Sequence, residues 1–198
     1  MAFIQTISEP EAAGATADLY QQSLARSGYV PNMTKAFSHR PEVNAGWTAL
    51  LGSVRGNMEL RRYELVTLAA ARELRSSYCM LAHGSVVLRE FFTEAELLDI
   101  VAERANSALT DLERAIMRFA TRVVRDATSI SQGDVDALKS HGLSDAEIFD
   151  VVTCAAARCF FSKTLDALGV EPDAAYATID PELRTALVVG RPIEKTAS

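Results

Sequence analysis

Helix start signals recur along this chain, and apolar residues follow them at helical spacing. The pattern Ser/Thr-x-x-Glu, whose two side chains cap the free N–H groups of a first helical turn, begins at Ser8, Thr93, Thr110 and Ser144. After Thr110, apolar residues repeat every three or four positions over residues 112–123. The alternation of apolar and polar residues that marks β-strands is nearly absent. The sequence therefore predicts an all-α protein.

The helical pattern and its interruptions give an expected order of elements. We predict helices over residues 10–27, 41–55, 60–75, 77–92, 94–107, 111–127, 132–141, 145–168 and 181–188, with a short turn near 33–38. Gly28, Gly142 and Gly169 fall where the chain leaves a helix. The connections are short, so we expect one helical domain over residues 1–198. Its last residues, 191–198, contain few large apolar side chains and are expected to form a loose or partner-packed tail.

Charge and cysteine content narrow the classes of function. Lys and Arg number 20 against 26 Asp and Glu, which gives a net charge of −6 with the three histidines neutral. Such a field repels phosphate backbones, so we expect no nucleic-acid partner. No apolar run approaches the roughly 18 residues that cross a membrane, and the start of the chain has no secretory pattern. Three cysteines are too few for a disulfide framework. We expect a cytoplasmic protein without a membrane partner.

Residues 63–83 hold the side chains best suited to chemistry. Ser76 or Ser77 is predicted to cap a helix, so that Cys79 becomes its second or third residue, where the helix dipole favours a thiolate. His83 follows at i+4, about 40° around the helix, so the two side chains share a face. An imidazole beside a thiol can take its proton during nucleophilic attack. Glu64 is the candidate to orient His83, since an acid on an otherwise apolar helix needs a partner.

At these positions the chain resembles the carboxymuconolactone decarboxylase and alkyl hydroperoxidase D-like superfamily, especially its peroxidase-related branch. The family pattern is a glutamate, a twelve-residue step to Cys-x-x-Cys, and a histidine four residues after the second cysteine; Glu64, Cys79 and His83 match it. Other landmarks of the branch lie at residues 31–32, 39–42, 142–145 and 168–171, so that the resemblance covers roughly residues 10–175. It implies a helical bundle that forms a homo-oligomer, either a trimer or a hexamer, with no cofactor.

The chain departs from the family pattern at two positions. Ser76 stands where the family has its first cysteine, so Ser76-x-x-Cys79 cannot close the vicinal disulfide. Tyr78 stands where some members have a histidine, and it either weakens a proton relay or supplies a phenol donor. Cys154 and Cys159 lie about 140° apart on an apolar helix, and we interpret them as buried structural cysteines rather than resolving thiols.

These residues support three hypotheses. The leading one is an antioxidant one-cysteine peroxidase: Glu64 orients His83, His83 deprotonates Cys79, and the thiolate attacks a hydroperoxide to give a sulfenic acid that an external thiol reduces. The second is a cofactor-free lyase or isomerase, in which His83 and Glu64 do acid–base work on a small organic acid or lactone and Cys79 is incidental. The third is an oligomeric binding protein that has lost turnover.

Each candidate residue also has a structural interpretation. Cys79 can be a small buried residue, His83 a core histidine, and Glu64 the partner of a neighbouring arginine, which the sequence offers at Arg61, Arg62 and Arg72. A metal site built from Cys79, His83 and Glu64 is stereochemically possible. The sequence offers no evident fourth ligand, and the chemistry of the family that the chain resembles needs no metal. We therefore expect no metal. Trp47 is expected to pack in a core or in a subunit interface.

Overall fold

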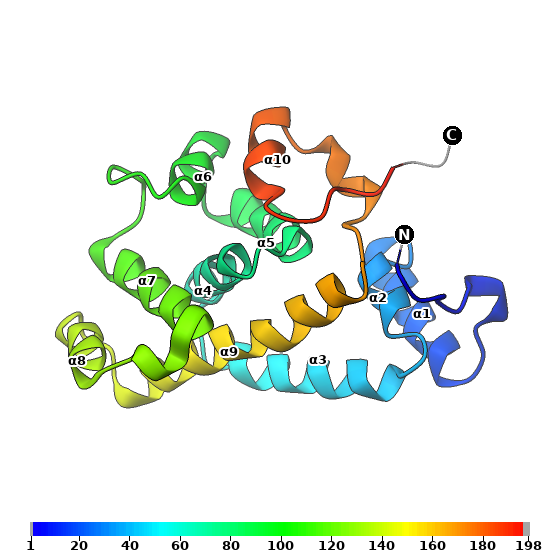
Figure 1. Ribbon diagram of the computed structural model, residues 1–198, viewed down its shortest axis with the longest axis horizontal. Helices are drawn as coiled ribbons and strands as arrows, with labels where there is room; N and C mark the ends of the chain where they lie inside the picture. Colours follow the sequence, from blue (N-terminus) through cyan, green and yellow to red (C-terminus); the bar gives the residue numbers. More distant parts are fainter. Residues whose placement is uncertain (1, 196–198) are drawn as a thin grey trace.

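The computed structural model describes residues 2–195, and within that range it consists of helices and their connections, with no β-strand (Figure 1). The helices are α1 (Ala15–Ser27), α2 (Asn32–Ala36), α3 (Pro41–Arg55), α4 (Leu60–Glu73), α5 (Ser77–Glu90), α6 (Glu94–Val101), α7 (Asp111–Asp126), α8 (Gln132–Ser140), α9 (Asp145–Ala167) and α10 (Pro181–Leu187), with short 3₁₀ turns at η1 (Glu9–Glu11), η2 (Ala127–Ser129) and η3 (Ala174–Thr178). The all-α prediction is confirmed.

The predicted start signals cap helices as expected. The side chains of Thr93, Thr110 and Ser144 each accept a hydrogen bond from the N–H of the glutamate three residues later, and that glutamate accepts one from the N–H of the capping residue. These capping boxes begin α6, α7 and α9. Ser8 forms a similar box with its glutamate, but only the three-residue η1 follows.

Two boundaries differ from the prediction by more than about two residues, and in both cases a residue with positive φ is involved. The first helix begins at Ala15 rather than near residue 10, because Gly14 just before it has a φ of 54°. The helix predicted over 94–107 ends at Val101, and Glu103 shortly after it has a φ of 55°. A residue with positive φ cannot belong to a right-handed helix. The sequence pattern alone did not reveal either break.

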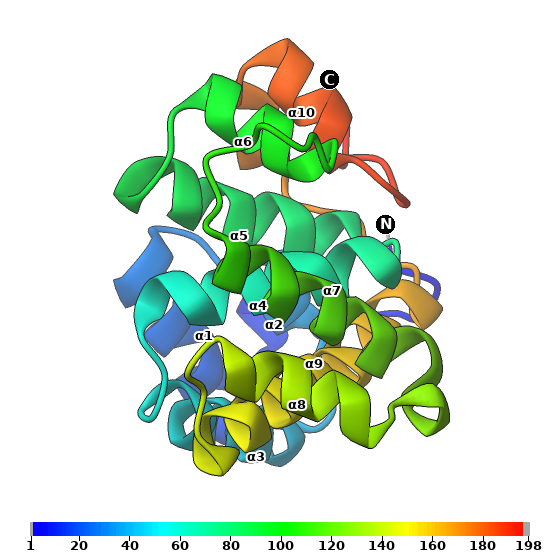
Figure 2. The same ribbon diagram turned by 90° about the vertical axis from the view of Figure 1, so that its left-hand side faces the viewer.

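Helix α4 is the centre of the molecule. It packs against α5, α7 and α9, and every residue from 63 to 71 is buried (Figure 2). Leu65 and Leu68 belong to an apolar core that also includes residues of α5, α6 and α10, whereas Val66 and Ala69 belong to a second core with α7, α8 and α9. Because α4 is packed on both sides, neighbouring helices restrict its position. Its one buried acid, Glu64, is therefore fixed in position.

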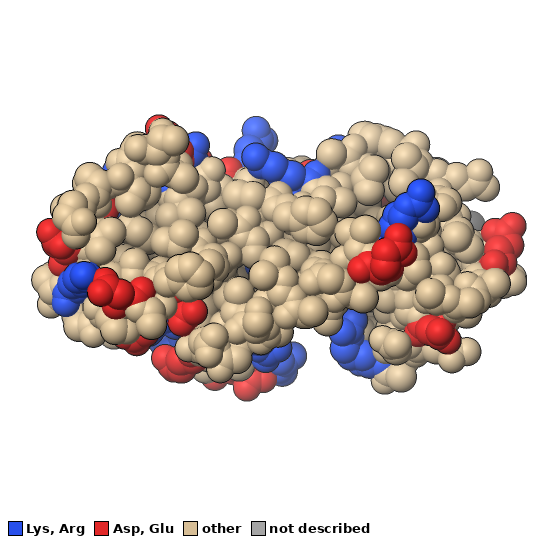
Figure 3. Space-filling model, turned by 90° about the horizontal axis from the view of Figure 1, so that it is seen from below, with Lys and Arg blue, Asp and Glu red and all other residues tan. Residues whose placement is uncertain are grey.

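Helices α1 and α2 lie at one end of the molecule, and α3 runs from that end towards its middle (Figure 1). Helix α3 runs along α9, where the indole of Trp47 stacks on the ring of Phe161 with 5.0 Å between ring centroids. Trp47 is buried, which places it in the core, one of its two expected environments. The α3 side of the surface shows charged side chains of both signs scattered over uncharged surface (Figure 3). No helix within residues 2–195 is long and apolar enough to cross a membrane.

The segment after α10 folds back over the start of α5. The Gly190 N–H donates to Ser77 Oγ at 2.8 Å, and the Arg191 guanidinium donates to the carbonyl of Asp166 at 2.6 Å. A Cβ atom at Gly190 would lie 2.0 Å from a backbone oxygen, so the close approach requires glycine. Residues 191–195 of the expected tail thus pack against the protein, while 196–198 lie outside the described residues.

Candidate active site

A tight connection between α4 and α5 brings the first two candidate residues together. Arg75 adopts a φ of 55° between the helices, and Ser76 is the N-cap of α5, as the sequence predicts. This reversal lays α5 against α4. Glu64 Oε2 then lies 2.6 Å from His83 Nδ1, and the Glu64 side chain is almost completely buried. The predicted pairing of Glu64 with His83 is present in the structure.

The other nitrogen of His83 has a partner on α9 that we did not predict. Arg158 Nη1 lies 3.0 Å from His83 Nε2, and Arg158 Nη2 donates to the hydroxyl of Tyr63. A guanidinium only donates hydrogen bonds, so His83 Nε2 must accept this one. The ring proton is therefore on Nδ1, which donates to the Glu64 carboxylate. The geometry defines one tautomer: a neutral imidazole between an anion and a cation.

Burial and charge both favour that neutral form. Burial lowers the pKa of His83, the positive charge of Arg158 lowers it further, and Glu64 opposes both effects. His83 is therefore unprotonated at Nε2 at neutral pH. Arg158 is only 2% exposed, and its charge compensates that of the buried Glu64. The network can accept a proton at one defined atom, Nε2, once Arg158 releases it.

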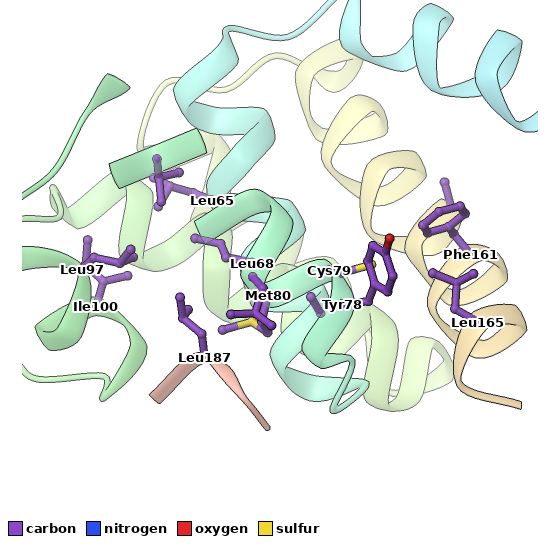
Figure 4. Packing of buried hydrophobic residues seen from close by; sticks show 14 of the residues in the cluster. Leu65, Leu68, Tyr78, Cys79, Met80, Leu97, Ile100, Phe161, Leu165 and Leu187 are labelled. Carbon is purple, nitrogen blue, oxygen red and sulfur yellow. The ribbon is translucent and has the colours of Figure 1, made fainter. Parts of the chain in front are cut away.

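Cys79 lies in a separate environment. It is the third residue of α5, as predicted, but it is only 1% exposed, and its sulfur lies 3.2 Å from Ser162 Oγ on α9. Figure 4 shows Cys79 and Tyr78 among the apolar side chains of the core, near Phe161 of α9. No hydrogen bond joins Cys79 to His83 within residues 2–195. The expectation that His83 takes the thiol proton directly is therefore corrected: both ring nitrogens already have other partners.

Ser76 and Tyr78 hold structure together rather than reach His83. Ser76 is completely buried, so the position of the family's first cysteine is closed to solvent. The Tyr78 hydroxyl donates to the carboxylate of Asp173 and accepts from the Met33 N–H at 3.2 Å, which ties α5 to α2 and to the start of η3. Burial raises the pKa of Tyr78 and the charge of Asp173 raises it further, so the phenol stays protonated.

The two remaining cysteines differ from each other. Cys154 is buried beside Thr67, with 3.8 Å between Sγ and Oγ1, and burial raises the pKa of its thiol to about 11. It is therefore a protonated, structural cysteine at neutral pH, as expected. Cys159 is partly exposed, so the expectation of burial is wrong for this residue. All three cysteines are free.

The metal-binding alternative does not fit the arrangement of donors. The Cys79 sulfur faces Ser162, while the Glu64 carboxylate and both nitrogens of His83 are engaged with each other and with Arg158. Within residues 2–195, no group of three or more His, Cys, Asp or Glu side chains lies close enough together to hold an ion. The three candidate ligands do not converge on one point.

Sequence reasoning missed Arg158, Tyr63 and Ser162, which complete the site. Arg158 carried a usable signal, because it is the only charged residue in the apolar segment 151–161. The reasoning that a buried acid needs a partner applies equally to a buried cation. Ser162 carried no such signal, since a serine inside a helix is common and its contact with Cys79 depends on how α5 and α9 pack.

Comparison with known proteins agrees with the fold. The model of the carboxymuconolactone decarboxylase family matches residues 41–122, which run from the start of α3 into α7 and include Glu64, Cys79 and His83. Over these residues the chain matches the carboxymuconolactone decarboxylase family. No curated protein sequence matches it.

Solved structures show how widely this fold is shared. An uncharacterised peroxidase-related protein with an alkylhydroperoxidase core, from Ralstonia eutropha JMP134, is 19% identical, with a TM-score of 0.72 over 95% of this chain and 100% of its own. A peroxidase-related protein from Silicibacter sp. TM1040 is 22% identical, with a TM-score of 0.75 over 87% and 94%. The debrominase Bmp8 in complex with 2,3,4-tribromopyrrole is 12% identical, with a TM-score of 0.75 over 92% and 100%. The same fold thus occurs in proteins described by different activities.

Proposed function

We propose that the protein is an enzyme that transfers protons on a small organic substrate through His83, as a lyase or isomerase. One observation carries this proposal: Glu64 and Arg158 hold His83 from both sides and define a neutral imidazole with its basic nitrogen at Nε2. A neutral histidine at neutral pH is suited to act as a general base. Within residues 2–195 the Cys79 sulfur makes no hydrogen bond to this network; its partner is Ser162.

The network contains a group that can stabilise each of the two charges that form during such a reaction. When Nε2 accepts a proton from a C–H bond of the substrate, the electron pair stays on the substrate as an enolate, and His83 becomes an imidazolium. The Glu64 carboxylate stabilises that imidazolium through Nδ1. Arg158, released from Nε2, is a cation placed to stabilise the enolate. His83 then returns the proton to another atom of the substrate, which completes an isomerisation, or to a leaving group that the enolate expels, which completes a lyase reaction.

A thiol peroxidase is the second candidate, and the position of Cys79 favours it. The sulfur lies in the first turn of α5, and two structural relatives are described as peroxidase-related. In this reaction the thiolate attacks the O–O bond, an alcohol leaves, and an external thiol reduces the resulting sulfenic acid. The core must open to admit the peroxide, since Cys79 is only 1% exposed.

Three variants distinguish the two candidates. Exchange and isomerisation of acetoacetate and of α-angelica lactone are followed by proton NMR in D₂O, and cumene hydroperoxide consumption is followed with dithiothreitol. We expect proton exchange to fall by at least about a hundredfold in His83→Gln and Glu64→Gln and to persist in Cys79→Ser. Hydroperoxide turnover that is lost in Cys79→Ser and kept in His83→Gln would instead establish the peroxidase.

A further inference from the structure

A cavity of about 350 Å³ opens between α1, α2 and α3, close to the His83 network. Its lining includes the aromatic side chains of Trp47, Tyr63 and Phe161, together with the exposed Arg26 and Arg55. None of the residues that line it is Asp or Glu. In a chain with a net charge of −6, this cavity is a local region of positive charge.

The two arginines of the cavity are not neutralised by the protein. Most arginines form ion pairs: Arg61 lies 2.5 Å from Glu113, and Arg125 lies 2.8 Å from Glu73. Within residues 2–195, neither Arg26 nor Arg55 has a carboxylate within ion-pair distance. Arg55 makes a cation–π contact instead, with its guanidinium carbon 6.0 Å from the ring centroid of Tyr63. Their charge is therefore available to a ligand.

The buried Arg158 connects the cavity to His83. Its guanidinium carbon lies 5.6 Å from the ring centroid of Trp47 and 5.5 Å from that of Tyr63, and both rings line the cavity. Arg158 Nε is buried and has no hydrogen-bond partner within residues 2–195. An unpaired buried donor is rare and costly. Arg158, which donates to His83 Nε2, therefore has one unpaired N–H donor, at Nε, and its guanidinium lies against the two rings that line the cavity.

We infer that this cavity binds a small carboxylate with a planar, apolar body next to the His83 network. Arginine binds carboxylates through two parallel hydrogen bonds, and aromatic walls pack against planar bodies. The volume lies near the lower end of the range for small-molecule sites, so it fits a ligand about the size of benzoate. This binding site stands on the cavity and its unpaired arginines and does not depend on the proposed function.

The experiment uses an internal reporter, because Trp47 is the only tryptophan of the chain and lines the cavity. The full-length protein is titrated with benzoate and with the neutral benzamide while tryptophan fluorescence is recorded. We expect a saturable change with benzoate that is at least about tenfold weaker with benzamide and weakens with salt. Arg55→Gln and Arg26→Gln should each raise the dissociation constant about tenfold. Arg118→Gln, an exposed arginine of α7 outside the cavity, should leave it unchanged.

Three results would overturn the inference: no saturable change with benzoate, equal affinity for benzamide, or an affinity that is the same in Arg55→Gln and Arg26→Gln as in the wild type. The titration requires no turnover, so it is repeated in His83→Gln. Benzoate binding together with proton exchange that survives His83→Gln refutes the proposed function and keeps the anion site. His83-dependent proton exchange without benzoate binding refutes the anion site and keeps the function.

Discussion

Cys79 and His83, the two residues of α5 that the sequence singled out, lie one helical turn apart in very different surroundings. The His83 side chain is 17% exposed and lies in a charged network with Glu64 and Arg158, whereas Cys79 is 1% exposed and lies in the apolar core. Both reach α9, where their partners follow in opposite order: Arg158 for His83 and Ser162 for Cys79. The packing of α9 therefore gives each residue its own partner, one helical turn apart.

This difference shows why sharing a helical face does not imply a shared function. Residues four apart on one helix are neighbours, but each makes its hydrogen bonds to whatever the facing helix supplies. Here α9 supplies a cation at one level and a hydroxyl at the next. The charged level, formed by His83, Glu64 and Arg158, is suited to proton transfer. The apolar level, formed by Cys79 and Ser162, is suited to holding a thiol out of solvent.

The largest expected effect comes from breaking the charged level. Arg158→Met should destabilise the protein by about 3 kcal/mol, because it leaves the buried Glu64 without a compensating cation. Arg125→Met is the matched control, since it breaks an ion pair of a mostly exposed arginine and should cost far less. Urea denaturation measures both. Equal costs for the two variants would show that the buried network does not hold the fold.

A smaller effect is expected at the apolar level. Cys79→Ala removes a buried sulfur and its contact with Ser162, and it should cost about 1 kcal/mol. Cys159→Ala, at a partly exposed position of α9, should stay within about 0.5 kcal/mol of the wild type. The same urea experiment compares them. A neutral Cys79→Ala would mean that this level is looser than the structure describes.

The pH dependence of stability reports on the charged level alone. Because burial and Arg158 lower the pKa of His83 in the folded protein, the unfolded chain binds a proton first as the pH falls below about 6.5. The stabilising contribution of neutral His83 is therefore present above this value and is lost as the pH falls. Wild type should lose more stability than His83→Gln between about pH 7.5 and pH 5.5. Parallel losses in the two proteins would contradict the lowered pKa.

Thiol labelling sharpens the comparison without perturbing the fold. Cys159 is partly exposed, while Cys79 and Cys154 are buried, so a thiol reagent should modify Cys159 first in the native protein. The other two should react only as the protein unfolds. Peptide mass spectrometry after brief treatment identifies the modified residue. Rapid labelling of Cys79 would show that its core opens readily and would favour the peroxidase.

Local sequence signals predicted most of the fold, and distant packing determined the rest. Capping residues and apolar spacing act within one or two turns, so Thr93, Thr110 and Ser144 mark true helix starts. The positive φ of Glu103 has no comparable signal, because nothing about a glutamate favours it. The end of α6 was consequently placed too late.

The candidate site shows the same division. Glu64 and His83 were predicted as partners because only a short turn separates their helices. Arg158 lies 75 residues from His83, and its contact depends on how α9 packs on the rest of the molecule. The family pattern singled out Cys79 and His83 but did not say that α9 would supply each with a separate partner.

The tautomer of His83 tests the central claim most directly. The chain has three histidines, so ¹⁵N-labelled histidine gives few NMR signals, and His83→Gln assigns the one of interest. His39 is an internal contrast, because its Nε2 lies 2.7 Å from the carbonyl of Gln5 and must donate the hydrogen bond. At neutral pH we predict that His83 carries its proton on Nδ1 and none on Nε2. A proton on Nε2, or a fully protonated ring, would contradict the account of His83 as a neutral base held between Glu64 and Arg158.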